Sequence, residues 1–153
     1  MNSQTICEIV ENDFDLNGLL KEMTSKTSGA VVIFTGIVRG ITEKGVPVET
    51  SALVYEAYKP MAIKMMNKIA DEMRMRWPQI ESIAIQQKIG SLYPGDVSVV
   101  IACSTPHRND GVFEAARFGI DRLKEIVPVW KKEINSSGEV WIEGKYTPQP
   151  SDQ

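Results

Sequence analysis

The sequence predicts an α+β protein in which two long helices pack against a mainly antiparallel sheet. Two segments carry apolar residues at helical spacing, and each of these segments is closed by a proline. Apolar segments of strand length lie before, between and after the two helices. The chain has 153 residues without a repeat or a flexible linker, so we expect a single domain with a buried core over residues 1–153.

The first 40 residues are expected to form a strand, a short helix and a second strand. "TICEIV", residues 5–10, has the composition of a strand. A helix is predicted from Asp15 to about Lys26, with Leu16, Leu19, Leu20 and Met23 on one side. Residues 29–40, "GAVVIFTGIVRG", are the most hydrophobic strand candidate, which predicts burial on both faces. Gly36 within them predicts a bulge or a close backbone approach.

A polar segment separates this strand from the next one. Residues 41–50, "ITEKGVPVET", contain a glycine and a proline and are expected to form an exposed loop. The following "SALVYEAY" alternates in polarity and predicts a strand with Leu53, Tyr55 and Ala57 on one face.

The first long helix is predicted to begin at Pro60. Proline has no backbone N–H, and in the first turn of a helix that N–H would have no hydrogen-bond partner within the helix in any case. Pro78 ends this helix. The buried stripe is expected to contain Ala62, Met66, Ile69, Met73 and Trp77. The methionines could line a groove for a partner, but core packing is the favoured interpretation.

The second half of the chain repeats this pattern. Two strands are predicted at residues 80–90 and 96–104, joined by a Pro-Gly turn. The second long helix is expected to begin near Asn109–Asp110, both good N-cap residue types, and to end at Pro128. Its predicted buried stripe contains Phe113, Ala116, Ile120, Leu123 and Val127. Residues 129–144 predict a small C-terminal β unit of two short strands around a Ser-Ser-Gly turn.

Composition narrows the classes of function. The formal net charge is −3, so the global field does not favour a nucleic-acid-binding surface. The sequence has no secretory signal at its start and no run near the roughly 18 apolar residues that span a bilayer. Cys7 and Cys103 cannot by themselves form a disulfide framework or a four-ligand zinc site, and one histidine excludes a multi-histidine metal site. We therefore expect a reduced, cytoplasmic protein with no metal site and no membrane segment.

Cys103 lies four residues before the single histidine, which raises the possibility of a Cys-His nucleophile. Its position at the end of an apolar strand favours an inert buried thiol instead.

That histidine, His107, stands beside Arg108 in "STPHRNDGVFEA", between an apolar strand and the second long helix. Helix N-termini bind anions through unpaired backbone N–H groups, and a guanidinium adds two donors suited to phosphate or carboxylate. The segment therefore suggests a pocket for an anionic substrate. The alternative, a turn that is basic by chance, is favoured for an isolated His-Arg pair.

Two further basic positions have two interpretations each. Lys124, at the edge of an apolar stripe, either keeps its ammonium in water, which is favoured, or is partly desolvated and suited to acid–base or nucleophilic chemistry. Lys131, Lys132 and Glu133 form a charged cluster on an expected edge strand, with Lys131 and Glu133 on one face. Alone, this cluster indicates a solvated surface.

Six segments nevertheless follow one another in a distinctive order between residues 29 and 143. They are "GAVVIFTGIVR", "LVYEAYKPMA", "RWP", "IGSLYPGD", "PHRNDGVFEA" and "LKEIVPVWKKE". In this order they resemble the large, catalytic subunit of molybdopterin synthase, the MoaE family. The first 28 residues and the last ten carry little of the resemblance.

The resemblance implies an α/β hammerhead fold and a sulfurtransferase that uses no cofactor. Such an enzyme converts cyclic pyranopterin monophosphate (precursor Z) into molybdopterin, in molybdenum cofactor biosynthesis, by installing two dithiolene sulfurs. The sulfur arrives as a C-terminal Gly-Gly thiocarboxylate on a small ubiquitin-like carrier subunit of the MoaD type. The implied assembly is a heterotetramer built on a homodimer of catalytic subunits.

The resemblance also implies which residues form the site. Substrate binding is implied for Ile37, Val38, Arg39, His107, Arg108, Lys132 and Glu133, and both catalysis and substrate binding for Lys124 and Lys131. The two lysines could orient the thiocarboxylate, move protons, or form a transient bond with the carrier's acyl carbon. Lys145 stands where some members have an arginine that reaches the neighbouring subunit's site. A lysine is a point charge and lacks the arginine's bidentate geometry.

The residue types suit this chemistry, because cationic donors bind a cyclic phosphate and offset the charge that develops as its ring opens. A thiocarboxylate is itself a sulfur nucleophile, so no protein cysteine is required. Two alternatives remain: a non-catalytic anion-binding or assembly module of the same fold, and a single-stranded nucleic-acid binder that uses Trp130 and Tyr93. The acidic balance of the chain argues against the second.

Overall fold

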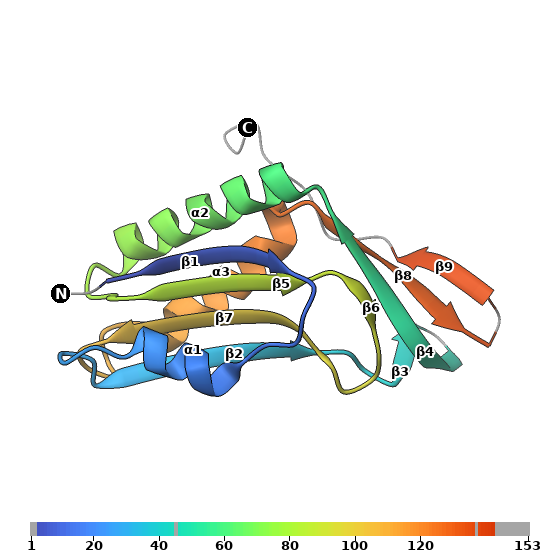
Figure 1. The fold of residues 1–153 in the computed structure, drawn as a ribbon, viewed down its shortest axis with the longest axis horizontal. Helices are drawn as coiled ribbons and strands as arrows, with labels where there is room; N and C mark the ends of the chain where they lie inside the picture. Colours follow the sequence, from blue (N-terminus) through green and yellow to red (C-terminus); the bar gives the residue numbers. More distant parts are fainter. Residues whose placement is uncertain (1–2, 45, 137, 143–153) are drawn as a thin grey trace.

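A computed structural model describes residues 3–44, 46–136 and 138–142, which form two sheets and three helices (Figure 1). In chain order the elements are β1 (Thr5–Val10), α1 (Leu16–Met23), β2 (Ala30–Ile37), β3 (Ile41–Lys44), β4 (Val46–Ala57), α2 (Lys59–Arg76), β5 (Ile83–Lys88), β6 (Gly90–Leu92), β7 (Val97–Thr105), α3 (Val112–Ile126), β8 (Val129–Asn135) and β9 (Gly138–Ile142). The predicted α+β architecture is confirmed.

The first sheet has the strand order β1-β5-β7-β2, and only β1 and β5 run parallel within it. The main core lies between one face of this sheet and the two long helices, α2 and α3. On the opposite face the short helix α1 packs through Leu19 and Met23 against Ala84, Val100 and Ala102 (Figure 1). The sheet is therefore covered on both faces, as a central layer must be.

The stripe predicted for α2 is confirmed, because Ala62, Met66, Ile69 and Met73 are fully buried. These methionines belong to the core and do not line a partner groove. In α3 the stripe is confirmed except at its start, where Phe113 is 63% exposed and Val112 is fully buried. Val112 lies four residues before Ala116 and shares its face, whereas Phe113 is rotated by about 100° around the helix.

The second sheet has the order β3-β4-β8-β9, and β6 pairs with β4. Its strands come from the middle as well as the end of the chain, so it is larger than the C-terminal pair that the sequence predicted. The expectation of a loop at residues 41–50 is wrong, since β3 and β4 pair there from Ile41 opposite Glu49 to Lys44 opposite Val46. This hairpin is formed by backbone hydrogen bonds, which do not require a particular pattern of polar and apolar side chains, so the polarity of the segment did not indicate strands.

The prediction that residues 29–40 are buried on both faces is also wrong. The strand β2 lies at the edge of the first sheet, and Phe34 and Ile37 are 36% and 50% exposed. The bulge predicted at Gly36 is confirmed by a register shift between Gly36 and Ile37. A side chain at Gly36 would also lie 2.5 Å from Val99 Cγ1, so the close backbone approach is confirmed as well.

The helix α1 starts as predicted, with Asp15 accepting a hydrogen bond from the Gly18 amide at 3.0 Å. It ends at Met23, before the predicted Lys26, because the chain becomes extended at Thr24. Within the described residues, no helix is long and apolar enough to cross a membrane.

The helix α3 starts at a different N-cap residue from those predicted. The N-cap is Gly111, at φ +94°, and neither Asn109 nor Asp110 caps the helix. The ring of Trp77 lies so close to Gly111 that a Cβ there would be 2.1 Å from Trp77 Cδ1. Trp77 also stacks edge-on against Phe118, with ring centroids 5.7 Å apart. Both the left-handed conformation and the contact with Trp77 require a glycine.

We predict that Gly111→Ala destabilises the protein more than Gly95→Ala does. Gly95 has a similar φ of +93° but nothing within 4 Å of the added Cβ, so it isolates the backbone penalty of about 1–2 kcal/mol. Overlap with Trp77 should add about 1–3 kcal/mol at Gly111. Urea unfolding of the two variants measures the difference. Equal losses of unfolding free energy in the two variants would mean that the Trp77 ring moves aside without destabilising the protein.

Candidate functional site

The predicted site residues form two groups at opposite ends of the first sheet. The first, which we call the junction group, contains Ile37, Val38, Arg39, Lys131, Lys132 and Glu133, where the two sheets meet. The second, the loop pair, contains His107 and Arg108, between β7 and α3. Lys145 lies outside the described residues.

Val38 brings the two halves of the junction group together. It is almost fully buried and packs with Leu53 and Leu92, against which Tyr55 and Ile142 also lie. Its backbone is held by the Asp96 carbonyl and the Gly95 amide, each at 2.9 Å. Leu53 pairs with Glu133, and Tyr55 and Ile142 pair with Lys131, so Val38 packs on the face of the second sheet that carries Lys131 and Glu133.

The β8 side chains alternate as predicted. Lys131 lies opposite Tyr55, with its Nζ 5.8 Å from the centre of the Tyr55 ring, and Glu133 points to the same face. Lys132 points to the other face, where its Nζ lies 3.1 Å from Glu139 Oε2 and 5.3 Å from the centre of the Trp141 ring. Of the three, Lys132 is therefore directed away from the face that carries Lys131 and Glu133.

Ile37 and Arg39 are exposed beside this face. Lys124 lies in the last turn of α3, separated from β8 by Val127 and Pro128. The Pro128 carbonyl accepts a hydrogen bond from the Tyr58 amide at 3.2 Å, which ties this link to the end of β4. Lys124 is thus at the junction end of α3. Its side chain is exposed.

The loop pair is exposed and its backbone is well ordered by hydrogen bonds. The His107 carbonyl accepts from Thr105 Oγ1 at 2.7 Å and from the Asp110 amide at 3.1 Å. The His107 amide donates to Asp110 Oδ2 at 2.9 Å. The expected convergence of backbone amides on an anion is therefore not available at His107, because Asp110 already occupies its N–H. The Arg108 guanidinium extends from this ordered loop into solvent.

Within one chain the two groups are too far apart to hold one small molecule. The strand β7 starts opposite Ile37, at Val97, and ends opposite Ala30, at Thr105. Its eight residue steps span about 26 Å. Along α3, Lys124 lies about 18 Å from Val112. Lys124 and the junction group thus both lie away from the loop pair.

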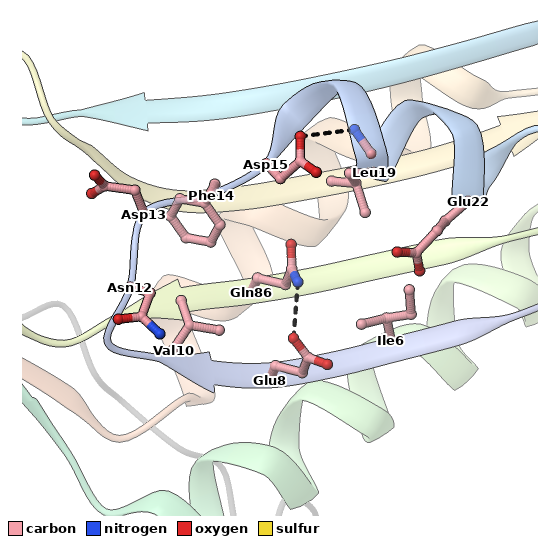
Figure 2. A pocket seen from close by; sticks show the side chains of 11 residues that line it. Ile6, Glu8, Val10, Asn12, Asp13, Phe14, Asp15, Leu19, Glu22 and Gln86 are labelled. Atoms are coloured by element: carbon pink, nitrogen blue, oxygen red, sulfur yellow. Dashed lines mark hydrogen bonds between the residues drawn. The ribbon is translucent and has the colours of Figure 1, made fainter.

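Two cavities in the described part of the chain contain none of the predicted site residues. One, of about 270 Å³, lies between α1 and the strands β1 and β5 (Figure 2). Carboxylates surround it, among them Glu8, Asp15 and Glu22, and they would repel an anion. The other, of about 610 Å³, is lined by Gln4, Lys21, Glu22 and residues 24–27. Neither of these two cavities therefore suits an anionic substrate through the predicted site residues.

Two residues that the sequence analysis did not single out belong with the junction group. Tyr55 lies under the Lys131 ammonium, and burial raises the pKa of its hydroxyl, while a hydrogen bond with Ser98 lowers it. Thr50 donates from Oγ1 to Glu133 Oε1 at 2.6 Å. Tyr55 stands in the distinctive "LVYEAY" segment, which could have drawn attention to it, whereas Thr50 was assigned to a loop and had no such signal.

The thiols take no part in this site. Cys103 is fully buried, its Sγ lies 3.3 Å from the Val112 carbonyl, and burial raises its pKa to about 12. Burial, followed by the charges of Asp71 and Glu8, raises the pKa of Cys7 to about 11. The interpretation of Cys103 as an inert thiol is confirmed. Among the described residues, no three His, Cys, Asp or Glu side chains gather to hold a metal ion.

Comparison with known proteins gives a consistent result. Residues 9–126 match the profile of the family described as "MoaE protein", so Lys131–Glu133 lie beyond its end. A protein of Halalkalibacterium halodurans named molybdopterin synthase catalytic subunit is 44% identical over 134 residues, which are 88% of this chain and 83% of that protein. The crystal structure of molybdopterin synthase from Staphylococcus aureus superposes with a TM-score of 0.81 at 43% identity, covering 89% of this chain and 96% of that chain.

A more distant structure, a complex of subunits 1 and 2 of molybdopterin-converting factor from Helicobacter pylori, superposes with a TM-score of 0.72. It is 20% identical and covers 92% of each chain, which shows a shared fold.

We predict that neither cysteine is alkylated at an appreciable rate in the folded protein at pH 8. With a pKa of about 11, about one Cys7 thiol in a thousand is ionised at this pH, against about one in four for an ordinary cysteine. Iodoacetamide should react with Cys7 at least about a hundredfold more slowly than with the unfolded chain, and about tenfold faster for each pH unit up to 10. Mass spectrometry of the alkylated peptides measures both rates. A Cys7 that reacts like a peptide thiol would contradict the burial argument.

Proposed function

Because the chain belongs to the MoaE protein family, we propose that it is the catalytic subunit of a molybdopterin synthase. The observation that carries the proposal is the meeting of two distinctive segments, "TGIVR" and "WKKE", at one place in the fold. Val38 packs with Leu53 of β4, and Leu53 pairs directly with Glu133 of β8, about 95 residues after Val38 in the sequence. The substrate is cyclic pyranopterin monophosphate and the product is molybdopterin.

The sulfur donor is the C-terminal thiocarboxylate of a small ubiquitin-like carrier subunit. In each transfer a bond forms between a carrier sulfur and a pterin carbon while a carbon–oxygen bond at that carbon breaks. Water then cleaves the bond between the sulfur and the carrier's acyl carbon, which restores the carrier's carboxylate. The Helicobacter pylori complex of two converting-factor subunits supports such a partner. The chain has no need of a nucleophilic cysteine in this scheme, which agrees with the raised pKa values of both thiols.

Three cations belong to the proposed site at the junction end. Arg39 and Lys131 offer charged donors for the phosphate, and Lys124 approaches from the last turn of α3. Such donors stabilise negative charge in the transition state more than in the ground state if they are already in place. Tyr55 contributes by holding the Lys131 ammonium over its ring. Lys124 then acts on the reacting atoms, by orienting the thiocarboxylate or by moving a proton.

The loop pair can serve the same substrate only from a second chain. His107 and Arg108 lie about a strand length from the junction group of their own chain. In a two-fold symmetric homodimer the loop pair of one subunit can complete the junction group of the other, so that two equal sites form. With one carrier bound at each site the assembly is a heterotetramer. It works in the cytoplasm, where the two free thiols remain reduced.

The first test is a reconstituted assay with Lys124→Ala. The protein is mixed with the thiocarboxylated carrier and cyclic pyranopterin monophosphate, and the dithiolene product is quantified as its fluorescent oxidised derivative. Loss of a group that moves a proton or stabilises developing charge lowers rates by 10²–10⁴-fold, so we expect at least about a hundredfold less product.

Lys21→Ala is the matched control, because Lys21 is also an exposed lysine in the last turn of a helix but lies on α1. It should leave the rate within about twofold of the unchanged protein, since surface substitutions away from a site have little effect. Absence of product from the unchanged protein with a verified thiocarboxylated carrier would instead favour the non-catalytic assembly module.

A second test asks whether one site is built from two chains. Lys124→Ala and Arg108→Ala proteins are unfolded together, refolded and assayed. If the two residues act from different subunits, half of the dimers are mixed and each of these has one intact site, which restores about a quarter of the full activity. If both residues act within one chain, the mixture stays as inactive as its components.

A further inference from the structure

We propose that Thr50 is a positioning residue of the anion site, which fixes the Glu133 carboxylate and ties the Arg39–Gly40 segment to β8. The inference rests on the proposed function for its substrate and deepens it. Thr50 itself touches neither substrate nor carrier in this proposal. It acts through Glu133.

Two hydrogen bonds place Thr50 between the two halves of the junction group. Its side chain is 3% exposed, and Oγ1 donates to Glu133 Oε1 at 2.6 Å. Its backbone N–H donates to the Gly40 carbonyl at 2.9 Å, directly after Arg39. Through this one residue the segment that follows β2 is connected to the strand that carries Lys131 and Glu133.

A bulge in β4 is what directs Thr50 toward Glu133. Thr50 pairs with Asn135 and Ala52 pairs with Ile134, so β4 contains one residue more than β8 at this point. In an unbroken strand, Thr50 would share a face with Ala52 and Val54, opposite Lys132. The extra residue, Ser51, turns Thr50 onto the other face, which carries Leu53 and Glu133. Bulges often re-aim a side chain beside a functional site.

The charges around Glu133 explain why its position matters. It is 6% exposed and lies on the face that carries Lys131. A carboxylate that changed its orientation would change the charge that the substrate's phosphate meets on this face. A charge-assisted hydrogen bond from a buried hydroxyl holds the carboxylate in one orientation, so that the charge on this face is already arranged when the substrate binds. Substrate affinity should therefore depend on Thr50 more than the chemical step does.

The chain contains a matched contact elsewhere. Thr27 donates from Oγ1 to Glu81, another buried glutamate, at the loop after α1. That contact has the same chemistry but lies outside the junction group and the loop pair. Thr27→Val thus reports what the loss of a threonine–glutamate hydrogen bond does to stability alone.

The experiment compares Thr50→Val, Thr50→Ser and Thr27→Val in the reconstituted assay, with saturating thiocarboxylated carrier and varied cyclic pyranopterin monophosphate. Valine keeps the shape of threonine and removes the hydroxyl. For Thr50→Val we expect KM to rise about tenfold to a hundredfold, the range of a hydrogen bond to a charged group, with kcat within about threefold. Thr50→Ser should restore KM to within about twofold. Thr27→Val should lower the unfolding temperature without changing KM.

A double variant tests whether Thr50 acts through Glu133. In a Glu133→Gln background, Thr50→Val should add less than about twofold to KM, because the carboxylate that it positions is gone. If Thr50→Val does not yield folded protein, Thr50→Ala replaces it, since a smaller side chain introduces no new contact.

The outcomes separate the two proposals. An inactive unchanged protein would overturn the proposed function. An active unchanged protein whose KM is insensitive to Thr50→Val would overturn only the role of Thr50. The role of Thr50 would also be overturned if Thr27→Val raised KM as much as Thr50→Val does, because the effect would then be a general loss of stability. It would be overturned as well if Thr50→Val raised KM by the same factor in the Glu133→Gln background as in the unchanged protein.

Discussion

The antiparallel pairing of β4 with β8 is the constraint on which the rest of this structure depends. It joins the middle of the chain to its end, so that Thr50 meets Glu133 across 83 positions of sequence. The same pairing places Tyr55 under Lys131, and Leu53 and Tyr55 of β4 belong to the apolar cluster that contains Val38. A stable antiparallel ladder needs continuous register, and here the register is broken once, by a bulge that turns a threonine toward a buried carboxylate. The geometry of the proposed site follows from this single pairing and its one irregularity.

The first sheet has a different role, since it determines how far apart the cationic groups lie. The strand β7 and the helix α3 both run along the first sheet, and both are held by a core of buried side chains (Figure 1). Such a core does not bend to bring the loop pair and the junction group together. The distance is therefore a fixed property of the subunit, and a site that uses both groups has to be shared between subunits.

The positive charges of the proposed site are a local feature of a chain whose overall charge is negative. The overall charge is −3, and the cavity beside α1 is rimmed with carboxylates, yet arginine and lysine side chains gather at the junction and the loop. A net negative surface disfavours nonspecific binding of nucleic acids, while a few placed cations still attract one phosphate. A glutamate on the face that carries Lys131 offsets part of the positive charge there, and the hydrogen bond from Thr50 fixes the orientation of its carboxylate.

Much of the fold could be predicted from the sequence, because helical spacing and proline positions act locally. The stripe of α2, the end of α3, the bulge at Gly36 and the paired strands β8 and β9 all followed from nearest neighbours in the chain. The order of short motifs likewise identified the family, and with it the residues of the expected site.

Tertiary structure alone decided three things. The hydrophobic β2 lies at a sheet edge, since strand order depends on pairing partners distant in sequence. The polar residues 41–50 form strands, since a ladder is made by backbone groups that every sequence carries. Finally, the bulge at Ser51 and the length of β7 determined which site residues meet, because register and distance are properties of the assembled sheets and not of any segment taken alone.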